Sequence, residues 1–340
     1  MKLSQLFNEI KVLEDVSTFS KHEQLVQGII NALDQKILVR GDILPSVNQM
    51  IKEIGFARET IARAYKELVN RGIIESKNRK GYFVATEDTE QHLRVCLLLY
   101  AFDTFQETFY QSFRNKIGEN IQLDVFFHHN NFSVFESTVN SIKGKYGMYV
   151  IAPIDVPEAV PLIEQFPMNK LLIVDRQLDL DEEHSYIVQE FKQSSYNAFV
   201  ELAERIKEFD QFVFFFKQQS AEPNDILGSF QRFIKDYKVN GIIKSKYEPG
   251  SIEPNKVYFT IHNLELWEIL KDSKIKGLKP GKDLGILSHN DDNVKEIIFD
   301  GITTFSIDFA KMGEMAAEFV LSRKPIKHIM KNELIRRNSL

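Results

Sequence analysis

Cysteine and long apolar runs are scarce in this sequence. Among 340 residues there is one cysteine, Cys96, which excludes an intramolecular disulfide and cannot alone hold a zinc ion. Because apolar residues flank it, we expect a buried core thiol rather than a nucleophile. The longest apolar run, Val95–Phe102, is much shorter than the roughly 18 residues that a membrane helix needs. The N-terminus lacks the apolar stretch of a secretion signal, so we expect a cytoplasmic protein without a membrane partner.

The motifs of common enzyme classes are also missing. The sequence has no glycine-rich dinucleotide loop, no Walker-type phosphate loop, no H-E-x-x-H zinc motif and no nucleophile elbow. His128 and His129 are adjacent, and consecutive strand residues face opposite sides of a sheet, so this pair is a poor metal motif. We therefore expect no enzymatic activity, no catalytic residue, no metal and no cofactor.

Composition and charge indicate a globular protein with two kinds of module. Hydrophobic residues make up 43% of the chain and charged residues 27%, which excludes disorder of the whole chain. The length favours two or three domains. The net charge of −5 by itself argues against nucleic-acid binding, but residues 1–86 carry a balance of +3 and the remainder −8. This division indicates two modules with different partners.

Residues 20–86 predict three helices and a short hairpin. The segments Ser20–Glu23 and Ser46–Gln49 are capping boxes, in which side chains satisfy free amides at a helix start, so they open the first two helices. Gly55 suits the left-handed position that ends the second helix. Apolar residues at helical spacing predict the third helix over 58–70.

The hairpin and the flanking segments complete this module. Strand-like segments at 73–76 and 82–84 enclose a basic turn at 77–81. Residues 1–19 form an extra arm whose apolar residues fit a helix, and the polar residues 87–92 are interpreted as a linker. Three short helices with a basic hairpin are typical of a winged helix-turn-helix, whose third helix enters the major groove of double-stranded DNA.

Polar and basic residues coincide on the two elements that such a domain brings to DNA. Arg58, in the first turn of the third helix, is of a type that can donate two hydrogen bonds to O6 and N7 of a guanine. Lys77 and Lys80 on the hairpin fit phosphates, and Gly81 allows close backbone approach. The alternative is that these charges only solvate an ordinary three-helix domain. The predicted DNA contacts are Ser46, Asn48, Gln49, Arg58, Glu59, Thr60, Arg63, Lys77, Arg79, Lys80 and Gly81.

These residues resemble the GntR family of bacterial regulators. The resemblance lies in Gly41-Asp42-X-Leu44-Pro45-Ser46, in Gly55-Phe56-Ala57-Arg58-Glu59-Thr60 and in Gly81-Tyr82-Phe83-Val84. The family's recognition helix opens with Ser-Arg-X-Thr, so the resemblance implies DNA contacts for Arg58 and Thr60. Ala57 stands where serine is usual, so the cap or phosphate contact of that hydroxyl is absent.

From residue 93 onward, apolar strands alternate with amphipathic helices. This pattern predicts parallel sheets covered on both faces, and the length predicts two lobes, that is, an α/β body with doubly wound parallel sheets. The expected helices span 105–117, 134–142 and 194–208. The expected strands span 94–100, 123–127, 148–152, 170–174, 212–216, 241–243, 256–260 and 284–287.

Ligands of doubly wound folds bind at the carboxyl ends of the strands, facing the cleft between lobes. Carboxylates accept and guanidinium groups donate in forks that suit hydroxyl-rich ligands, and aromatic rings stack on sugar faces. The alternative is that Asp and Asn follow strands because turns favour them. His262 is one of the polar residues after strands. The predicted ligand contacts are Phe102, Asp103, Phe105, Asp155, Asp175, Arg176, Glu190, Tyr196, Asn263, Asn290 and Asp291.

The body resembles the LacI-type, periplasmic-binding-like sensor domain. Matching stretches are Ile151-Ala152-Pro153, Ile173-Val174-Asp175-Arg176 and Gly281-Lys282-Asp283-Leu284-Gly285-Ile286. With the GntR head, the order of domains resembles the arabinose-repressor type of hybrid. The chain departs from the family at Asn263 and Glu190, where Asp is usual, and at Ser194-Ser195, where Gly-Gly is usual.

The resemblance implies a ligand-responsive transcriptional regulator, a repressor of carbohydrate metabolism genes. We expect a DNA-binding domain at 20–86, a linker at 87–92 and a sensor domain at 93–340 that binds a sugar or sugar derivative. A homodimer would bind a pseudo-palindromic operator. The alternatives are a GntR-headed enzyme, for instance an aminotransferase fusion, and a regulator that senses a non-sugar metabolite.

Overall fold

The computed structural model describes residues 2–13, 20–78, 80–86, 93–119, 121–143, 145–180, 183–218 and 222–340. They form two compact units. The first unit contains Met1–Ala101, Phe113–Tyr186 and Met315–Lys327, and the second contains Phe102–Ser112, Ile187–Glu314 and His328–Leu340. The expected linker at 87–92 and the wing residue Arg79 lie outside the described residues.

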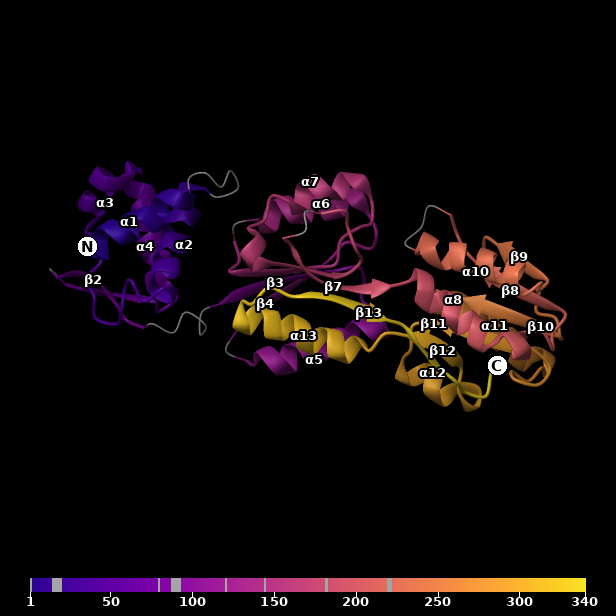
Figure 1. Cartoon of the computed structure of the whole chain (residues 1–340). Coiled ribbons are helices and arrows are strands. Elements are labelled where there is room, and N and C mark those ends of the chain that lie inside the picture. The colour runs from indigo at the N-terminus through magenta and orange to yellow at the C-terminus, as the bar shows by residue number, and fades with distance from the viewer. Residues whose placement is uncertain are drawn as a thin grey trace. The chain divides into compact units, whose positions relative to one another are not determined.

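The N-terminal part of the first unit is a winged helix-turn-helix, as predicted. Its helices are α1 (Lys2–Val12), α2 (Lys21–Asp34), α3 (Val47–Ile54) and α4 (Arg58–Asn70), and β1 (Ile74–Lys77) pairs antiparallel with β2 (Gly81–Val84) (Figure 1). Both capping boxes are formed, and Gly55 ends α3 in the left-handed conformation.

Helix α1 is the helix expected in the N-terminal arm, and it belongs to the core of this domain. Leu6 and Ile10 are fully buried in one apolar cluster with residues of α2, α3 and α4. The close approach of α1 requires glycine at position 28 of α2. A Cβ atom at Gly28 would lie 2.5 Å from Ile10 Cγ1 and 3.0 Å from Ile10 Cα.

The remainder of the first unit is built on a parallel sheet with the strand order β13-β7-β6-β5-β3-β4. The pairs of β3 with β4, β3 with β5 and β5 with β6 are parallel. Figure 1 shows α6 and α7 over one face, and α5 and α13 over the other. Cys96 on β3 is buried as predicted, and burial raises the pKa of its thiol. The strands are β3 (Arg94–Leu99), β4 (Gln122–Phe127), β5 (Met148–Ile151), β6 (Leu171–Asp175), β7 (Ser185–Glu190) and β13 (Lys327–Lys331), and the helices are α5 (Thr104–Ile117), α6 (Phe132–Ile142), α7 (Val160–Ile163) and α13 (Phe309–Ser322). The boundary between the units divides four of these elements: α5 up to Ser112, α13 up to Glu314, β7 from Ile187 and β13 from His328 belong to the second unit.

The second unit repeats this plan with the strand order β14-β12-β11-β10-β8-β9. The five strands from β12 to β9 pair in parallel with their neighbours, and β14 closes one edge antiparallel to β12. Phe212 and Phe214 of β8 pack against α8 and α10, whereas Val213 and Phe215 pack on the opposite face with α11. The strands are β8 (Gln211–Phe215), β9 (Gly241–Lys244), β10 (Lys256–Thr260), β11 (Gly285–His289), β12 (Thr303–Ser306) and β14 (Glu333–Ile335), and the helices are α8 (Lys192–Glu201), α9 (Ala203–Ile206), α10 (Asn224–Asp236), α11 (Asn263–Lys276) and α12 (Asn293–Ile297).

The expected doubly wound α/β class is confirmed, with a few differences in the elements. The helix expected over 194–208 is interrupted at Leu202, between α8 and α9. Strand β12 was not predicted, because its sequence Thr-Thr-Phe-Ser is polar although all four residues are buried. Its hydroxyls are satisfied internally: Thr303 donates to the Arg337 carbonyl (3.0 Å) and Thr304 to Asp291 (2.8 Å).

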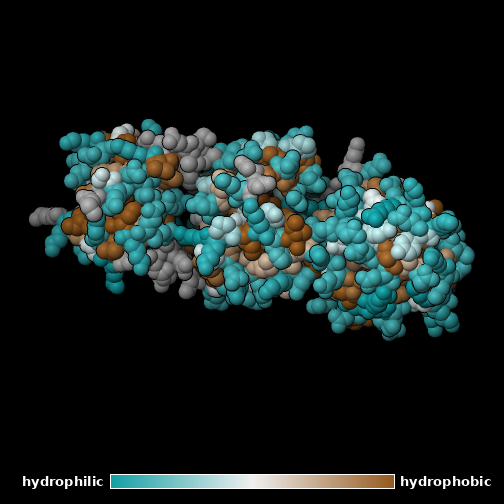
Figure 2. Space-filling view, viewed as in Figure 1, coloured by the Kyte–Doolittle hydropathy of each residue, from teal (hydrophilic) through white to brown (hydrophobic). Residues whose placement is uncertain are grey.

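Hydrophilic residues cover most of the visible surface, with apolar residues scattered among them (Figure 2). Among the described residues, no helix has the length and apolar character needed to cross a membrane.

We predict that Gly28→Ala destabilises the N-terminal domain, because the new methyl group collides with the side chain and backbone of Ile10. Overpacking of this kind typically lowers the free energy of unfolding by about 1–3 kcal/mol. Denaturant titration measures the change. The control is Gly228→Ala in α10, where a Cβ meets nothing within 4 Å and helix propensity favours alanine. Equal or higher stability of Gly28→Ala would contradict the packing of α1.

Candidate nucleic-acid interface and effector site

The recognition helix α4 is held by its buried face and exposes its first turn. Ile61, Ala64 and Leu68 are fully buried, and the buried Tyr65 hydroxyl donates to the Pro45 carbonyl at 2.6 Å. Arg58, Glu59 and Arg63 are exposed, and Thr60 is half-buried. Ala57 occupies the N-cap without a side-chain hydrogen bond, in agreement with the expected loss of the serine contact. The free amides of this first turn therefore face solvent and suit a phosphate.

Two predicted DNA contacts are joined by a side-chain hydrogen bond. The guanidinium of Arg58 donates to the Asn48 side-chain oxygen, which links the start of α4 to α3. This bond restricts the rotamers of Arg58, because a long exposed side chain otherwise samples many conformations. Asn48 is therefore placed to orient Arg58.

The remaining predicted DNA contacts lie on the start of α3 and on the wing. The Ser46 hydroxyl accepts from the backbone amide of Gln49 at 3.2 Å, and the side-chain oxygen of Gln49 accepts from the backbone amide of Ser46 at 2.9 Å. Both side-chain oxygens are therefore engaged in capping α3. Lys77, Lys80 and Gly81 of the wing are exposed. Lys77 lies 2.8 Å from Glu75 and 4.8 Å from the centroid of the Phe83 ring.

In the first unit, predicted effector contacts follow neighbouring parallel strands. Asp155 comes after β5 and is exposed, whereas Asp175 ends β6 with a φ of 69° and lies 3.7 Å from Arg176. His128, after β4, is buried, and its Nε2 lies 2.9 Å from the Ala152 carbonyl. Burial lowers the pKa of His128 to about 4, so this imidazole is neutral at pH 7. The carboxyl edge of this sheet thus presents one acidic and one basic side chain side by side.

In the second unit, the structure brings together the residues after β10 and β11. Asn263 opens α11, and its amide lies 3.3 Å from Asp292. Thr104 at the start of α5 donates to the same carboxylate at 2.9 Å, which places the segment of Phe102 and Asp103 at this edge. Phe102 is 70% exposed, whereas the ring of Phe105 packs 4.9 Å from that of Phe309.

Asn290 and Asp291 are held by the protein itself. Arg337 forms a two-pronged ion pair with Asp291 at 2.6 and 2.8 Å. Against the effect of burial, Arg337 and Thr304 hold the pKa of Asp291 below its ordinary range. Asn290 has a φ of 58°, and its carbonyl accepts from the fully buried Lys295 ammonium at 2.7 Å. These contacts orient the loop after β11.

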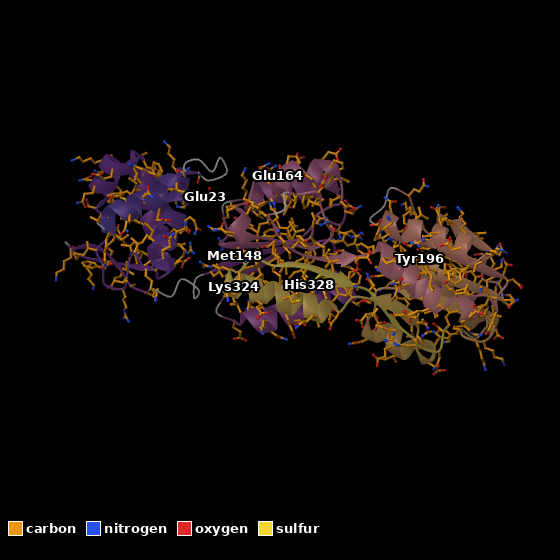
Figure 3. The ribbon with its side chains drawn as sticks, in the orientation of Figure 1. Glu23, Met148, Glu164, Tyr196, Lys324 and His328 are labelled. Atoms are coloured by element: carbon orange, nitrogen blue, oxygen red, sulfur yellow. The ribbon has the colours of Figure 1, made fainter. Side chains whose placement is uncertain are left out.

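Glu190 and Tyr196, also predicted to contact the effector, have protein partners too. Glu190 accepts from the amides of Gln193 (2.7 Å) and Ser194 (2.6 Å) and from the Ser194 hydroxyl (2.8 Å) at the start of α8. Although burial opposes it, these bonds hold the pKa of Glu190 below its ordinary range. Tyr196 lies on α8 (Figure 3) and donates to Asp236, the last residue of α10, at 2.8 Å.

Sequence reasoning missed two acidic residues at the edge of the second sheet. Glu222, in the segment after β8, lies 3.2 Å from Nε2 of His262, which occupies the N-cap position of α11 without a side-chain capping bond. Glu265, in the first turn of α11, is half-buried beside them. Glu222 had no detectable signal, because it belongs to an irregular segment, whereas Glu265 follows a predicted site residue by two positions. Among the residues that the structure describes, no group of three metal-ligating side chains is found.

We predict that Arg58→Ala weakens binding to a DNA duplex selected from a random pool by about 1–3 kcal/mol and relaxes specificity at one base. Fluorescence anisotropy at several salt concentrations measures the affinity. The control is Arg232→Ala, which removes an exposed arginine of α10.

The hydrogen bond from Arg58 to Asn48 predicts a second result of the same titration. Asn48→Ala should lower the DNA affinity less than Arg58→Ala does. In the double variant the two losses of binding free energy should not add, because the bond couples the two side chains. Unchanged affinity and salt slope of Arg58→Ala would show that α4 does not read DNA.

Comparison with known proteins agrees with this geometry. Residues 21–84 match the sequence model of the gntR family of bacterial regulatory proteins. Over 66 residues the chain is 35% identical to the HTH-type transcriptional regulator Rv1152 of Mycobacterium tuberculosis, a match that covers 19% of this chain and 54% of that protein. This chain thus spans about half the length of the curated relatives that it matches.

Solved structures resemble the body of the chain. The trehalose repressor from Escherichia coli superimposes with a TM-score of 0.61 at 10% identity, over 72% of this chain and 99% of that one. A LacI family transcriptional regulator from Lactobacillus casei with bound glucose gives a TM-score of 0.62 at 14% identity, over 73% of this chain and 99% of that one. The chain therefore combines an N-terminal helix-turn-helix domain of the gntR family with a body that has the fold of LacI-type regulators.

Proposed function

We propose that this protein is a ligand-responsive transcriptional regulator, a repressor of carbohydrate metabolism genes. In this proposal, residues 20–86 bind double-stranded DNA, residues 87–92 are a linker, and residues 93–340 bind a sugar or sugar derivative. The protein acts in the cytoplasm, is not an enzyme and requires no cofactor. The observation that carries the proposal is the exposed first turn of α4, with Arg58 held by Asn48, in a domain of the gntR family.

The proposal that residues 20–86 bind DNA is supported by the winged helix-turn-helix fold and by the position of its exposed cations. Helix α4 carries exposed Arg58 and Arg63, and the wing carries exposed Lys77 and Lys80, so cations lie on both elements that reach DNA. An arginine can donate two hydrogen bonds to O6 and N7 of one guanine, whereas a lysine on the wing neutralises phosphate charge without distinguishing bases. We propose that a homodimer presents two such heads to a pseudo-palindromic operator, since a two-fold symmetric protein binds a symmetric site.

The proposal that the body binds an effector is supported by the polar side chains at the carboxyl ends of its strands. Each sheet has a set of parallel strands with polar side chains at their carboxyl ends, the position where doubly wound folds bind ligands. A LacI family regulator of this fold from Lactobacillus casei has been solved with bound glucose and with bound sucrose, which supports a sugar as the class of effector. Asp155 and Arg176 at the sheet of the first unit, and separately Asp103 and Asn263 at the sheet of the second, supply donors and acceptors of the kind that hydroxyl groups require.

We propose that the effector acts by differential affinity for two conformations of the sensor. A ligand shifts such an equilibrium only as far as its affinities for the two states differ. A coupling of about 1–3 kcal/mol is typical of such switches and changes operator affinity about 5- to 150-fold.

We predict that a sugar raises the melting temperature of the full chain in a thermal-shift panel of monosaccharides, disaccharides, sugar acids and sugar phosphates. A ligand at 100 times its dissociation constant adds about 2.7 kcal/mol to the free energy of unfolding. NMR of each hit after long incubation should show the sugar unchanged. Conversion of the sugar would support an enzyme, and the absence of any shift across the panel would contradict a sugar sensor.

A further inference from the structure

A small pocket in the first unit is lined by cationic and amide side chains from segments that are distant in sequence. Its volume is about 50 Å³. That is several times the roughly 10–15 Å³ that one water molecule needs, but far less than the roughly 300–1,000 Å³ of typical small-molecule sites. The pocket therefore has room for a small ion and not for a sugar ring. Its polar lining residues are Gln27, Asn31, Arg71, Asn169, Lys170 and Arg323, all within the first unit.

The three cations of the pocket come from three separate segments. Arg71 directly follows α4, Lys170 directly precedes β6, and Arg323 directly follows α13. Met148, another lining residue, and Lys324, the neighbour of Arg323 in sequence, lie at the same end of the first sheet (Figure 3). Because α4 belongs to the N-terminal domain and the other two segments belong to the body, a molecule in the pocket can contact both.

Positive charge exceeds negative charge at this pocket. Arg323 forms an ion pair with Asp34, the last residue of α2, and the guanidinium of Arg71 lies 3.4 Å from the Glu67 carboxylate. Among the residues that the structure describes, the lining and its ion-pair partners thus comprise three cations and two carboxylates. Since charges interact more strongly where water is excluded, this excess favours the binding of an anion.

Lys170 is the most deeply buried of the three cations. The residue is 7% exposed, whereas the side chains of Arg71 and Arg323 are 21% and 35% exposed. Burial lowers the pKa of Lys170 to about 7, the charge of Arg323 adds to this shift, and the charge of Asp34 opposes it. An anion beside the ammonium stabilises its charged form, so the burial of Lys170 strengthens the attraction for an anion.

The hydrogen-bonding groups of the pocket suit an anion with several oxygen atoms. The side-chain oxygen of Asn31 accepts from the Gln27 amide at 2.8 Å, so the group that Asn31 can offer to a ligand is its NH₂ donor. A guanidinium group donates in a planar fork that matches two oxygens of a phosphate or sulfate, and an ammonium group adds a compact charge. These donors fit a tetrahedral oxyanion better than a chloride ion.

We propose that this pocket binds a phosphate-sized oxyanion through Lys170, Arg71 and Arg323, at the junction of the N-terminal domain and the body. The oxyanion is a free ion or the phosphate group of a larger molecule. The site is distinct from the proposed sugar site. Leu93, Gly147 and Lys170 directly precede β3, β5 and β6, so the pocket lies at the amino ends of these parallel strands, opposite the carboxyl ends assigned to the sugar.

Calorimetric titration of the full chain with phosphate, and separately with sulfate, tests the proposal. The buffer contains neither ion, and chloride keeps its ionic strength constant. We expect saturable binding of both ions, and Lys170→Met should weaken it at least about tenfold. A methionine replaces the buried ammonium at similar length, so the melting temperature without ligand should stay equal or rise. The control Lys145→Met removes an exposed lysine of the same unit and should leave the affinity unchanged.

Titration with glucose 6-phosphate and with glucose distinguishes the two sources of the oxyanion. Binding of glucose 6-phosphate that is lost in Lys170→Met would support a site for the phosphate group of a metabolite, whereas binding of the inorganic ions alone would support a site for the free ion. No saturable binding of any of these anions, or equal affinities in Lys170→Met and the unaltered chain, would overturn the proposal. Loss of phosphate binding in Arg58→Ala but not in Lys170→Met would place the ion at α4 and would overturn it too.

Discussion

The proposed function depends most on the packing that holds α4 against its own domain. Ile61, Ala64, Tyr65 and Leu68 are buried on one side of the helix, and the hydrogen bond from Tyr65 to the Pro45 carbonyl ties the middle of α4 to the turn before α3. A helix anchored in this way exposes its opposite side and its uncapped first turn to solvent, so the domain need not rearrange before these parts contact another molecule. The proposed DNA contact of Arg58 depends on that constraint, and the hydrogen bond to Asn48 restricts the Arg58 side chain further.

The body of the chain follows the same logic, because its sheet topology positions residues as the helix packing does in the N-terminal domain. Parallel strands bring residues that are distant in sequence to one edge: Glu222 after β8, His262 after β10 and Asp291 after β11. Several of these polar groups are engaged within the second unit. Arg337 holds Asp291, Lys295 holds the Asn290 carbonyl, and Asp292 holds Asn263 and Thr104. The loops at this edge of the sheet are thus oriented by ion pairs and hydrogen bonds within the second unit.

The sequence predicted the fold well where local signals agree with tertiary packing. Capping boxes at Ser20 and Ser46, the glycine at 55 and helical apolar spacing located α2, α3 and α4 closely. The apolar strands β3, β5, β8 and β10 were found because they are buried on both faces. Strand β12 was missed because its buried threonines satisfy their hydroxyls through Arg337 and Asp291, which are distant in sequence.

The candidate sites were less predictable, because the role of a polar side chain depends on its hydrogen-bond partners, which are distant in sequence. Asp291 and Glu190 were predicted as ligand contacts because they follow strands. Only the structure shows that Arg337 pairs with Asp291 and that amides at the start of α8 donate to Glu190. The position of Glu222 behind His262 had no local signal at all.

The most direct test of the account is the affinity of the full chain for its selected DNA duplex with and without a saturating sugar from the panel. Binding linkage requires that a sugar which changes DNA affinity has its own affinity changed by the same factor when DNA is present. The account predicts a reciprocal change of at least fivefold in both titrations. Tight binding of a sugar that leaves DNA affinity unaltered, with DNA equally without effect on the sugar, would contradict it.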